Sequence, residues 1–251
     1  MRHPLSWLPD IPVEQDDALA RVWERVTATT SVQDGRPHGT PRGTAFAMCC
    51  VRVPLAALTP EFAELRTQLA ALPMVCSEPD ELLHIPIQEL GYLTDSPQAR
   101  DEINEARLQE FASVATIPVG EYPPFTIRVG GVNSFLDAPF LDIHDGGWLN
   151  RIHRRLLDIA LVPTNTRYPY LPHITLGEYT ENAPASALIE TLRPWRETTF
   201  GEFAVTDIEI CTRRTDDRDA PFDVRYTLPL ATATTVTPFT SAPNSVPSAI
   251  N

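Results

Sequence analysis

The feature that most constrains the fold is a short pattern that occurs twice: histidine, isoleucine, any residue, an aliphatic residue, any residue and glutamate. The first copy begins at His84 and reads HIPIQE, and the second begins at His173 and reads HITLGE. Each copy follows a leucine-containing run and leads into a polar loop and then a helical pattern. Because both copies carry strand-forming aliphatic residues, each predicts a short β-strand. The repeat therefore predicts two similar halves.

The second copy predicts which side chains share a face. Side chains alternate along a strand, so His173 and Thr175 point to one side while Ile174 and Leu176 point into packing. This places an imidazole beside a hydroxyl, with an apolar anchor behind them. With six histidines in the chain, one His-x-Thr alone would carry little information, and the second copy gives the pattern its weight.

On these residues the chain resembles the 2H phosphoesterase superfamily, which includes bacterial 2′-5′ RNA ligase-like proteins and RNA 2′,3′-cyclic phosphodiesterases. That superfamily has two His-x-Thr/Ser-x motifs, one in each half of a pseudo-symmetric fold. The segment Pro172–Gly177, PHITLG, matches the motif closely, whereas the first copy has Pro86 where the family has Thr or Ser. The resemblance extends over roughly residues 44–230.

The resemblance implies an α+β fold with two pseudo-symmetric lobes, each an antiparallel sheet with helices outside, and an active cleft between them. It also implies a metal-independent phosphodiesterase without a cofactor. Its substrate would be a 2′,3′-cyclic phosphate, a cyclic nucleotide or a short 2′-5′ oligonucleotide. His84 and His173 would form the acid/base pair, because imidazoles titrate near neutral pH, and Thr175 would bind phosphate.

Pro86 breaks the symmetry of the two motifs. It has no hydroxyl and no N–H for a β-ladder, so it favours a bulge or an unpaired position and halves the expected phosphate contacts. Gln88 and Tyr92, with Thr94, are candidates for the missing contact by position. Two further substrate-binding candidates lie in the loop before the second motif, where Arg167 would approach phosphate and Tyr170 would stack on a base.

The proline leaves three interpretations open: an altered substrate, a slower enzyme, or a binding protein that kept the fold. The principal alternative to an enzyme is therefore a non-catalytic module that binds a nucleotide or an RNA end. A weaker alternative is a protein-interaction subunit, suggested by the acidic composition, a helix near the N-terminus and an apolar tail.

Composition limits the partners. The net charge is −13 and the chain contains no lysine, so it lacks the basic face that a long nucleic acid requires. A small nucleotide or an RNA end stays possible, because a few arginines reverse the charge locally. We expect no membrane association and no secretory signal. Four cysteines without C-x-x-C spacing predict buried, reduced thiols and a cytoplasmic location. The sequence predicts no particular oligomeric state.

The chain divides into an N-terminal extension with one helix (1–43), the two-lobed domain (44–230), and a Thr/Ser/Pro-rich tail (231–251) predicted to be disordered. Asp142, His144, Asp145 and His153 match no strong metal signature, so we interpret them as structural. Asp216 to Asp219 predict a charged hairpin tip. Strands are expected at 44–53, 82–90, 123–132, 139–143, 170–177, 202–212 and 222–230, and helices at 13–26, 59–72, from 96 through 111, 148–161 and 185–192.

Overall fold

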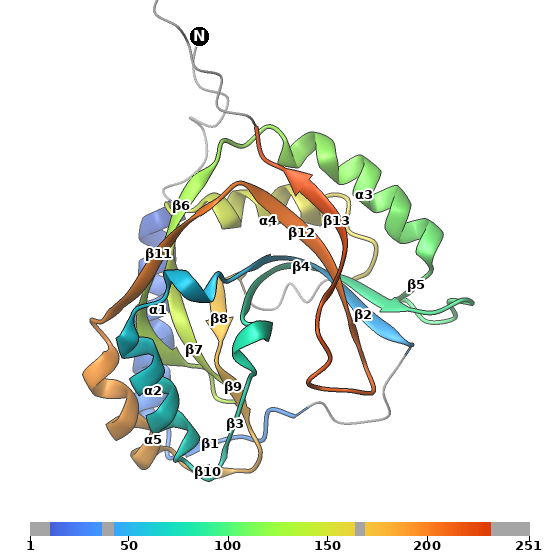
Figure 1. The fold of residues 1–251 in the computed structure, drawn as a ribbon. Helices are drawn as coiled ribbons and strands as arrows, with labels where there is room; N and C mark the ends of the chain where they lie inside the picture. Colours follow the sequence, from blue (N-terminus) through green and yellow to red (C-terminus); the bar gives the residue numbers. More distant parts are fainter. Residues whose placement is uncertain (1–10, 37–42, 164–168, 232–251) are drawn as a thin grey trace, which may run out of the picture.

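The two copies of the histidine motif lie on neighbouring strands that belong to different sheets. The computed structural model describes residues 11–36, 43–163 and 169–231 (Figure 1). His84 begins β4 (His84–Leu93), and His173 begins β8 (His173–Thr175). The two strands contact each other without pairing in one sheet. The repeat in the sequence therefore places one histidine from each half where the sheets meet.

Each sheet is almost entirely antiparallel. The five-stranded sheet has the order β13-β12-β2-β4-β5, in which only β4 and β5 pair in parallel. Its other strands are β2 (Ala45–Arg52), β5 (Glu102–Ile103), β12 (Asp207–Arg214) and β13 (Asp223–Pro229). The four-stranded sheet has the order β11-β6-β7-β8. It contains β6 (Phe125–Ser134), β7 (Pro139–His144) and β11 (Thr199–Val205).

Two short ribbons complete the described strands. The first pairs β1 (Ser31–Val32) with β10 (Ala183–Pro184), and the second pairs β3 (Val75–Ser77) with β9 (Gly177–Tyr179). β1 and β3 precede the first repeat, whereas β10 follows the second repeat and β9 begins within its last two residues. They therefore tie the two halves of the chain together.

Four of the five α-helices in the described residues form two pairs, and each pair takes one member from each half. α3 (Glu105–Val119) packs on α4 (Trp148–Leu157), and these helices contact β13 and β4 of the five-stranded sheet. α2 (Pro60–Ala70) packs on α5 (Ala185–Leu192), and α2 contacts β11 of the other sheet. Figure 1 shows α3 and α4 above the five-stranded sheet, and α2 and α5 at the lower left. Three 3-10 turns lie at Leu55–Ala57, Asp80–Leu82 and Arg193–Trp195.

One continuous apolar core joins both sheets to both helix pairs. The motif strands contribute Ile85 and Ile87 from β4 and Ile174 from β8, all essentially fully buried. The α+β class with two sheets and packed helices is therefore confirmed, and so is the burial of Ile174 behind the two half-buried residues His173 and Thr175.

The extension predicted at 1–43 packs against the rest of the chain where it is described. Its helix α1 (Ile11–Ala28) contacts β6, and its side chains Leu19 and Val26 are buried. Val32 of β1 belongs to the main core. Residues 37–42 and almost all of the predicted tail lie outside the described residues.

Three expected elements differ from the structure. The helix expected from Ser96 begins only at Glu105, capped by the Asn104 side chain, and Ile103 belongs to β5 instead. The single strand expected at 202–212 is two strands, β11 and β12, in different sheets. The strand expected at 170–177 reduces to β8, after which the chain changes partner and forms β9.

All four cysteines are free. Cys49, Cys50 and Cys211 are buried as predicted, whereas Cys76 is only half-buried, because it lies beside Arg218 near the surface. Within the described ranges, no helix combines the length and the apolar character that crossing a bilayer requires.

Candidate functional site

The two motif histidines are held by the same local hydrogen bond. Nδ1 of His84 lies 2.9 Å from the carbonyl oxygen of Leu82, and Nδ1 of His173 lies 2.7 Å from that of Leu171. In each case the partner precedes the histidine by two residues. A carbonyl oxygen can only accept, so Nδ1 carries the proton and Nε2 is the basic nitrogen of the neutral ring. Nε2 of both rings has no partner among the described residues.

Each imidazole also contacts phenylalanine edges. The ring centroid of His84 lies 4.9 Å from that of Phe222, and His173 lies 5.0 Å from Phe135 and 5.4 Å from Phe140. These contacts are edge-on and leave little rotational freedom to the imidazoles. Neither motif predicted these three phenylalanines, because they lie in turns or on another strand, away from both histidines in the sequence.

Burial is the main cause that lowers the pKa of both histidines. Desolvation disfavours the imidazolium, and the Arg213 cation lowers the pKa of His84 further. For His173, burial again lowers the pKa, and a charge on His84 lowers it too, while Asp137 opposes this effect. The charge on His84 thus acts on His173, in line with the contact between β4 and β8. The arrangement suits a neutral and a protonated imidazole sharing one site.

Thr175 and Pro86 occupy equivalent positions two residues after the histidines. Thr175 is half-buried, and its hydroxyl makes no hydrogen bond within the described part of the chain. Pro86 lies at a register shift between β4 and β2, where Cys50 pairs with Pro86 and Cys49 with Gln88. The bulge predicted from the proline is therefore present, and the two half-sites differ in their polar groups.

Two side chains from the second half of the chain form hydrogen bonds with the carbonyl oxygens at this bulge. The Tyr170 hydroxyl donates to the carbonyl oxygen of Pro86 at 2.8 Å, and Nδ1 of His153 lies 2.7 Å from that of Ile87. The two aromatic rings stack at 4.2 Å. Tyr170, expected to contact a base, thus has its hydroxyl bound to the protein and one ring face against His153. Burial raises the pKa of its phenol.

The other expected substrate contacts are not gathered around the histidines. Gln88 is buried, and its amide donates to the carbonyl oxygen of Glu89. Tyr92 stands at the far end of β4, edge-on to Phe46. The partners of Tyr92 and His84 on β2 are Phe46 and Arg52, six residues apart, so at about 3.3 Å per residue Tyr92 lies roughly 20 Å from His84. Arg167 lies outside the described residues.

A charged cluster that the motifs did not reveal lies next to His84. Arg213, at the end of β12, places its guanidinium 5.8 Å from the ring centroid of Phe222 and donates to Glu78 at 2.7 Å. Arg218, from the hairpin predicted as a charged tip, also approaches Glu78 and donates to the carbonyl oxygen of Cys76. The hairpin therefore packs against β3.

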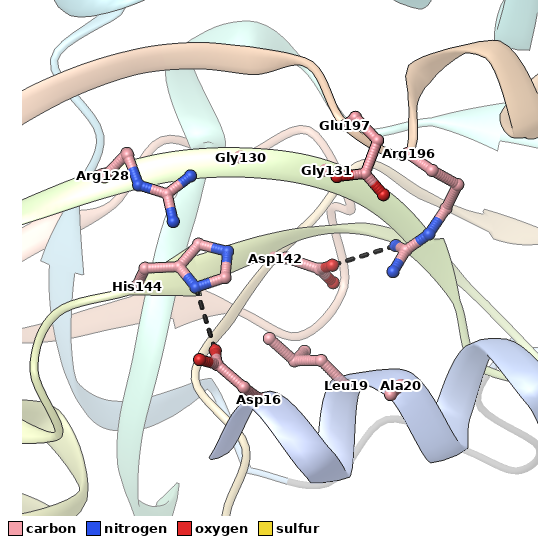
Figure 2. A pocket seen from close by; sticks show the side chains of 10 residues that line it. All are labelled: Asp16, Leu19, Ala20, Arg128, Gly130, Gly131, Asp142, His144, Arg196 and Glu197. Atoms are coloured by element: carbon pink, nitrogen blue, oxygen red, sulfur yellow. Dashed lines mark hydrogen bonds and ion pairs between the residues drawn. The ribbon is translucent and has the colours of Figure 1, made fainter. Parts of the chain in front are cut away.

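A separate hollow lies between α1 and the strands β6 and β7. Figure 2 shows Asp16 and Leu19 of α1 pointing toward it from below. Its charges are largely paired: Nδ1 of His144 lies 3.2 Å from Asp16, and Arg196 donates to Asp142 at 2.9 Å. The hollow is therefore part of the α1 packing, and we do not assign the chemistry to it.

The two carboxylates of the weak metal pattern have other partners. Asp142 also accepts from the Asn133 amide, and Asp145 accepts from the backbone N–H groups of Gly147 and Leu149 at the start of α4. Burial raises the pKa of both carboxyl groups. Over the ranges that the structure describes, no three histidine, cysteine or acidic side chains gather as a metal site.

The fold and the paired histidines agree with the comparison to known families. A model of the 2′-5′ RNA ligase superfamily matches residues 74–217. The match covers more than half of the chain, so the protein belongs to this superfamily of 2H phosphoesterases, with a first motif that lacks its hydroxyl. No curated protein sequence matches the chain significantly.

Solved structures show the same fold at low sequence identity. TT0787 of Thermus thermophilus has 18% identity and a TM-score of 0.55, and the similarity covers 73% of this chain and 97% of that one. E. coli LigT complexed with NADP+ has 14% identity and a TM-score of 0.51, covering 76% and 99%. E. coli LigT complexed with 3′-AMP has 15% identity and a TM-score of 0.51, covering 75% and 99%.

Proposed function

We propose that this protein is a metal-independent phosphodiesterase that acts on a 2′,3′-cyclic phosphate, a cyclic nucleotide or a short 2′-5′ oligonucleotide. The observation that carries the proposal is the matched pair of imidazoles, each fixed through Nδ1 with Nε2 left for substrate. The family membership and the nucleotides bound to the similar E. coli LigT support a nucleotide-sized ligand. Free cysteines support a cytoplasmic location.

The reaction needs two proton transfers, and the two histidines supply both. One neutral imidazole takes a proton from water as the water oxygen bonds to phosphorus. The bond from phosphorus to a ribose oxygen breaks, and the protonated imidazole gives that oxygen its proton. Thr175 donates a hydrogen bond to a non-bridging phosphate oxygen as charge develops there. Each proton transfer contributes about 10²–10⁴-fold.

Turnover of a small substrate panel tests this function. The panel contains 2′,3′-cyclic nucleotides, 2′-5′ dinucleotides and cyclic dinucleotides, with a chelator present throughout. We expect one class to be cleaved and His84→Ala and His173→Ala each to lose about 10²–10⁴-fold while staying folded. His144→Ala is the matched control, because His144 is a half-buried histidine that faces Asp16 of α1. If either motif variant matched wild type, the two-histidine mechanism would be wrong.

The second candidate function is a non-catalytic module that binds a nucleotide or an RNA end. The observation that favours it is Pro86, which removes one hydroxyl from the expected phosphate contacts. Calorimetry separates the two candidates. If the protein binds a nucleotide with an affinity that depends on Thr175 but turns over no substrate of the panel, the enzyme proposal is wrong and the binding module is the function.

A further inference from the structure

The half-site around His84 lacks a polar group from its own strand. Pro86 has no hydroxyl and no N–H, and its carbonyl oxygen already accepts from Tyr170. The next polar side chain along β4, Gln88, is buried and donates to the carbonyl oxygen of Glu89. A phosphate that bridges the two histidines would therefore meet Thr175 on one side and find no donor from β4 on the other.

Arg213 lies close to this gap, because it contacts the phenylalanine that packs on His84. The edge of Phe222 contacts His84 at 4.9 Å, and the Arg213 guanidinium lies 5.8 Å from the centroid of the same ring. The imidazole and the guanidinium thus contact the same phenylalanine ring. The Arg213 side chain is only 18% exposed, so a charge there acts in a less polar environment than water.

The protein fixes Arg213 without using all of its donors. Nη1 donates to the Glu78 carboxylate at 2.7 Å, and Nη2 donates to the carbonyl oxygen of Arg218. These bonds use one hydrogen on each terminal nitrogen. Nε–H and the second hydrogen on each terminal nitrogen have no partner in the described residues. A guanidinium held in this way is pre-organised to bind phosphate oxygens.

We propose that Arg213 binds the phosphate on the His84 side of the cleft, in place of the hydroxyl that Pro86 lacks. The inference rests on the proposed function, and it names the ligand group as the singly charged phosphate of a phosphodiester or cyclic phosphate. One half-site then uses the Thr175 hydroxyl and the other uses a cation from the β12–β13 hairpin. Burial lowers the pKa of His84 and the neighbouring cation lowers it further, which favours the neutral form that a base requires.

The first test removes the charge at Arg213. For hydrolysis of adenosine 2′,3′-cyclic phosphate, we expect Arg213→Gln to lower kcat/KM about 10- to 100-fold, the range of a charge-assisted hydrogen bond. Arg213→Lys should recover only part of this loss, because lysine cannot bind bidentately. The matched control is Arg218→Gln, which removes the other arginine beside Glu78 and should change kcat/KM less than threefold. Thermal unfolding verifies that each variant is folded.

The second test restores the missing hydroxyl. If Arg213 replaces it, Pro86→Thr should recover about tenfold or more of the activity lost in Arg213→Gln but change the wild-type background little. A purely structural role for Arg213 would not predict this rescue. Equal effects of Pro86→Thr in both backgrounds, or an Arg213→Gln loss no larger than that of Arg218→Gln, would overturn the inference.

Binding of inorganic phosphate separates this inference from the proposed function. Its affinity is measured by the shift of the histidine proton resonances during titration, which needs no turnover. We expect Arg213→Gln to weaken phosphate binding at least tenfold, whereas Arg218→Gln should not. If wild type cleaves no substrate but shows this difference, the enzyme proposal fails and the Arg213 contact stands. If the variant binds phosphate as well as wild type does, the Arg213 contact is wrong even when wild type is active.

Discussion

The charged groups beside His84 and His173 differ, although both imidazoles make the same hydrogen bond to the carbonyl oxygen two residues earlier. Burial lowers the pKa of both histidines. Beyond burial, the Arg213 cation lowers the pKa of His84 further, whereas for His173 the lowering by His84 is opposed by the Asp137 carboxylate. We therefore expect His84 to act as the base and His173 as the acid. A substrate whose leaving group needs no proton tests this assignment. On bis(4-nitrophenyl) phosphate, His173→Ala should lose less than about tenfold, against about 10²–10⁴-fold on a cyclic nucleotide.

The His84→Ala variant is the control for this assignment. Removal of the base slows attack by water on both substrates, so His84→Ala should lose activity on each to a similar extent. The opposite pattern, in which His84→Ala is the variant spared on the nitrophenyl ester, would exchange the two roles. Loss of both activities to the same degree in both variants would mean that neither histidine serves mainly as the acid.

The lowered pKa values of both histidines predict an acidic pH optimum. The active form needs one neutral and one protonated imidazole, so kcat/KM is largest between the two pKa values of the free enzyme. Burial lowers both pKa values below the ordinary one of about 6.5. The maximum of kcat/KM should therefore lie below about pH 6.5, and the rate should fall on the alkaline side as the acid loses its proton. A maximum above pH 7 would contradict these shifts.

At the scale of single elements, the bulge in β4 depends on a side chain from the other half of the chain. Tyr170→Phe removes the hydroxyl that donates to the Pro86 carbonyl oxygen while keeping the ring on His153. We expect it to lower the free energy of unfolding by about 1–2 kcal/mol, because a partly buried carbonyl loses its partner. Urea unfolding measures this change.

The matched control for the bulge is Tyr92→Phe. Tyr92 is also half-buried, but its hydroxyl has no hydrogen bond within the described residues, so the change should stay within about 0.5 kcal/mol. If Tyr170→Phe left stability unchanged and instead weakened substrate binding, Tyr170 would be the substrate contact that the sequence suggested. The structure favours the role in stability.

The sequence predicted the elements whose pattern is local and missed those set by distant pairing. Ile174 between two polar residues was enough to identify the second motif strand and its face. By contrast, Ile103 fits a helical spacing, and only its parallel pairing beside Leu93 places it on β5. A local signal was present between β11 and β12: apolar residues occupy odd positions at Phe203 and Val205 and even positions from Ile208. This change from odd to even positions marks the point where the chain passes from one sheet to the other.

The residues of the site also fall into those that a local pattern predicts and those that only the fold brings together. A repeat in the sequence can identify His84 and His173, because each motif carries its own anchor and its own carbonyl partner. Phe222 contacts His84, and Arg213 contacts Phe222, only through the folding of the β12–β13 hairpin, and no spacing in the sequence measures that approach. Pro86 indicated that a contact was missing, but only the fold shows which side chain stands beside the gap.

At the scale of the whole molecule, the duplicated halves form one indivisible unit. α4 of the second half contacts β4 of the first, and α2 of the first half contacts β11 of the second. The two ribbons β1–β10 and β3–β9 also join the halves. One histidine comes from each half, and the packing of the two halves on each other also brings β4 and β8, which carry the two imidazoles, into contact.

The net charge of the whole molecule makes a prediction about salt. With 20 basic and 33 acidic side chains, the chain has a net charge of −13 and repels an anionic substrate at long range. Salt screens this repulsion over a Debye length of about 10 Å at 0.1 M. Raising NaCl from about 0.02 to 0.2 M should therefore raise kcat/KM for a cyclic nucleotide by about two- to fivefold, with kcat unchanged. Sucrose at matched osmolality should have no such effect. A steep fall of kcat/KM with salt would instead indicate release of counterions from a basic groove, and long RNA would become the expected substrate.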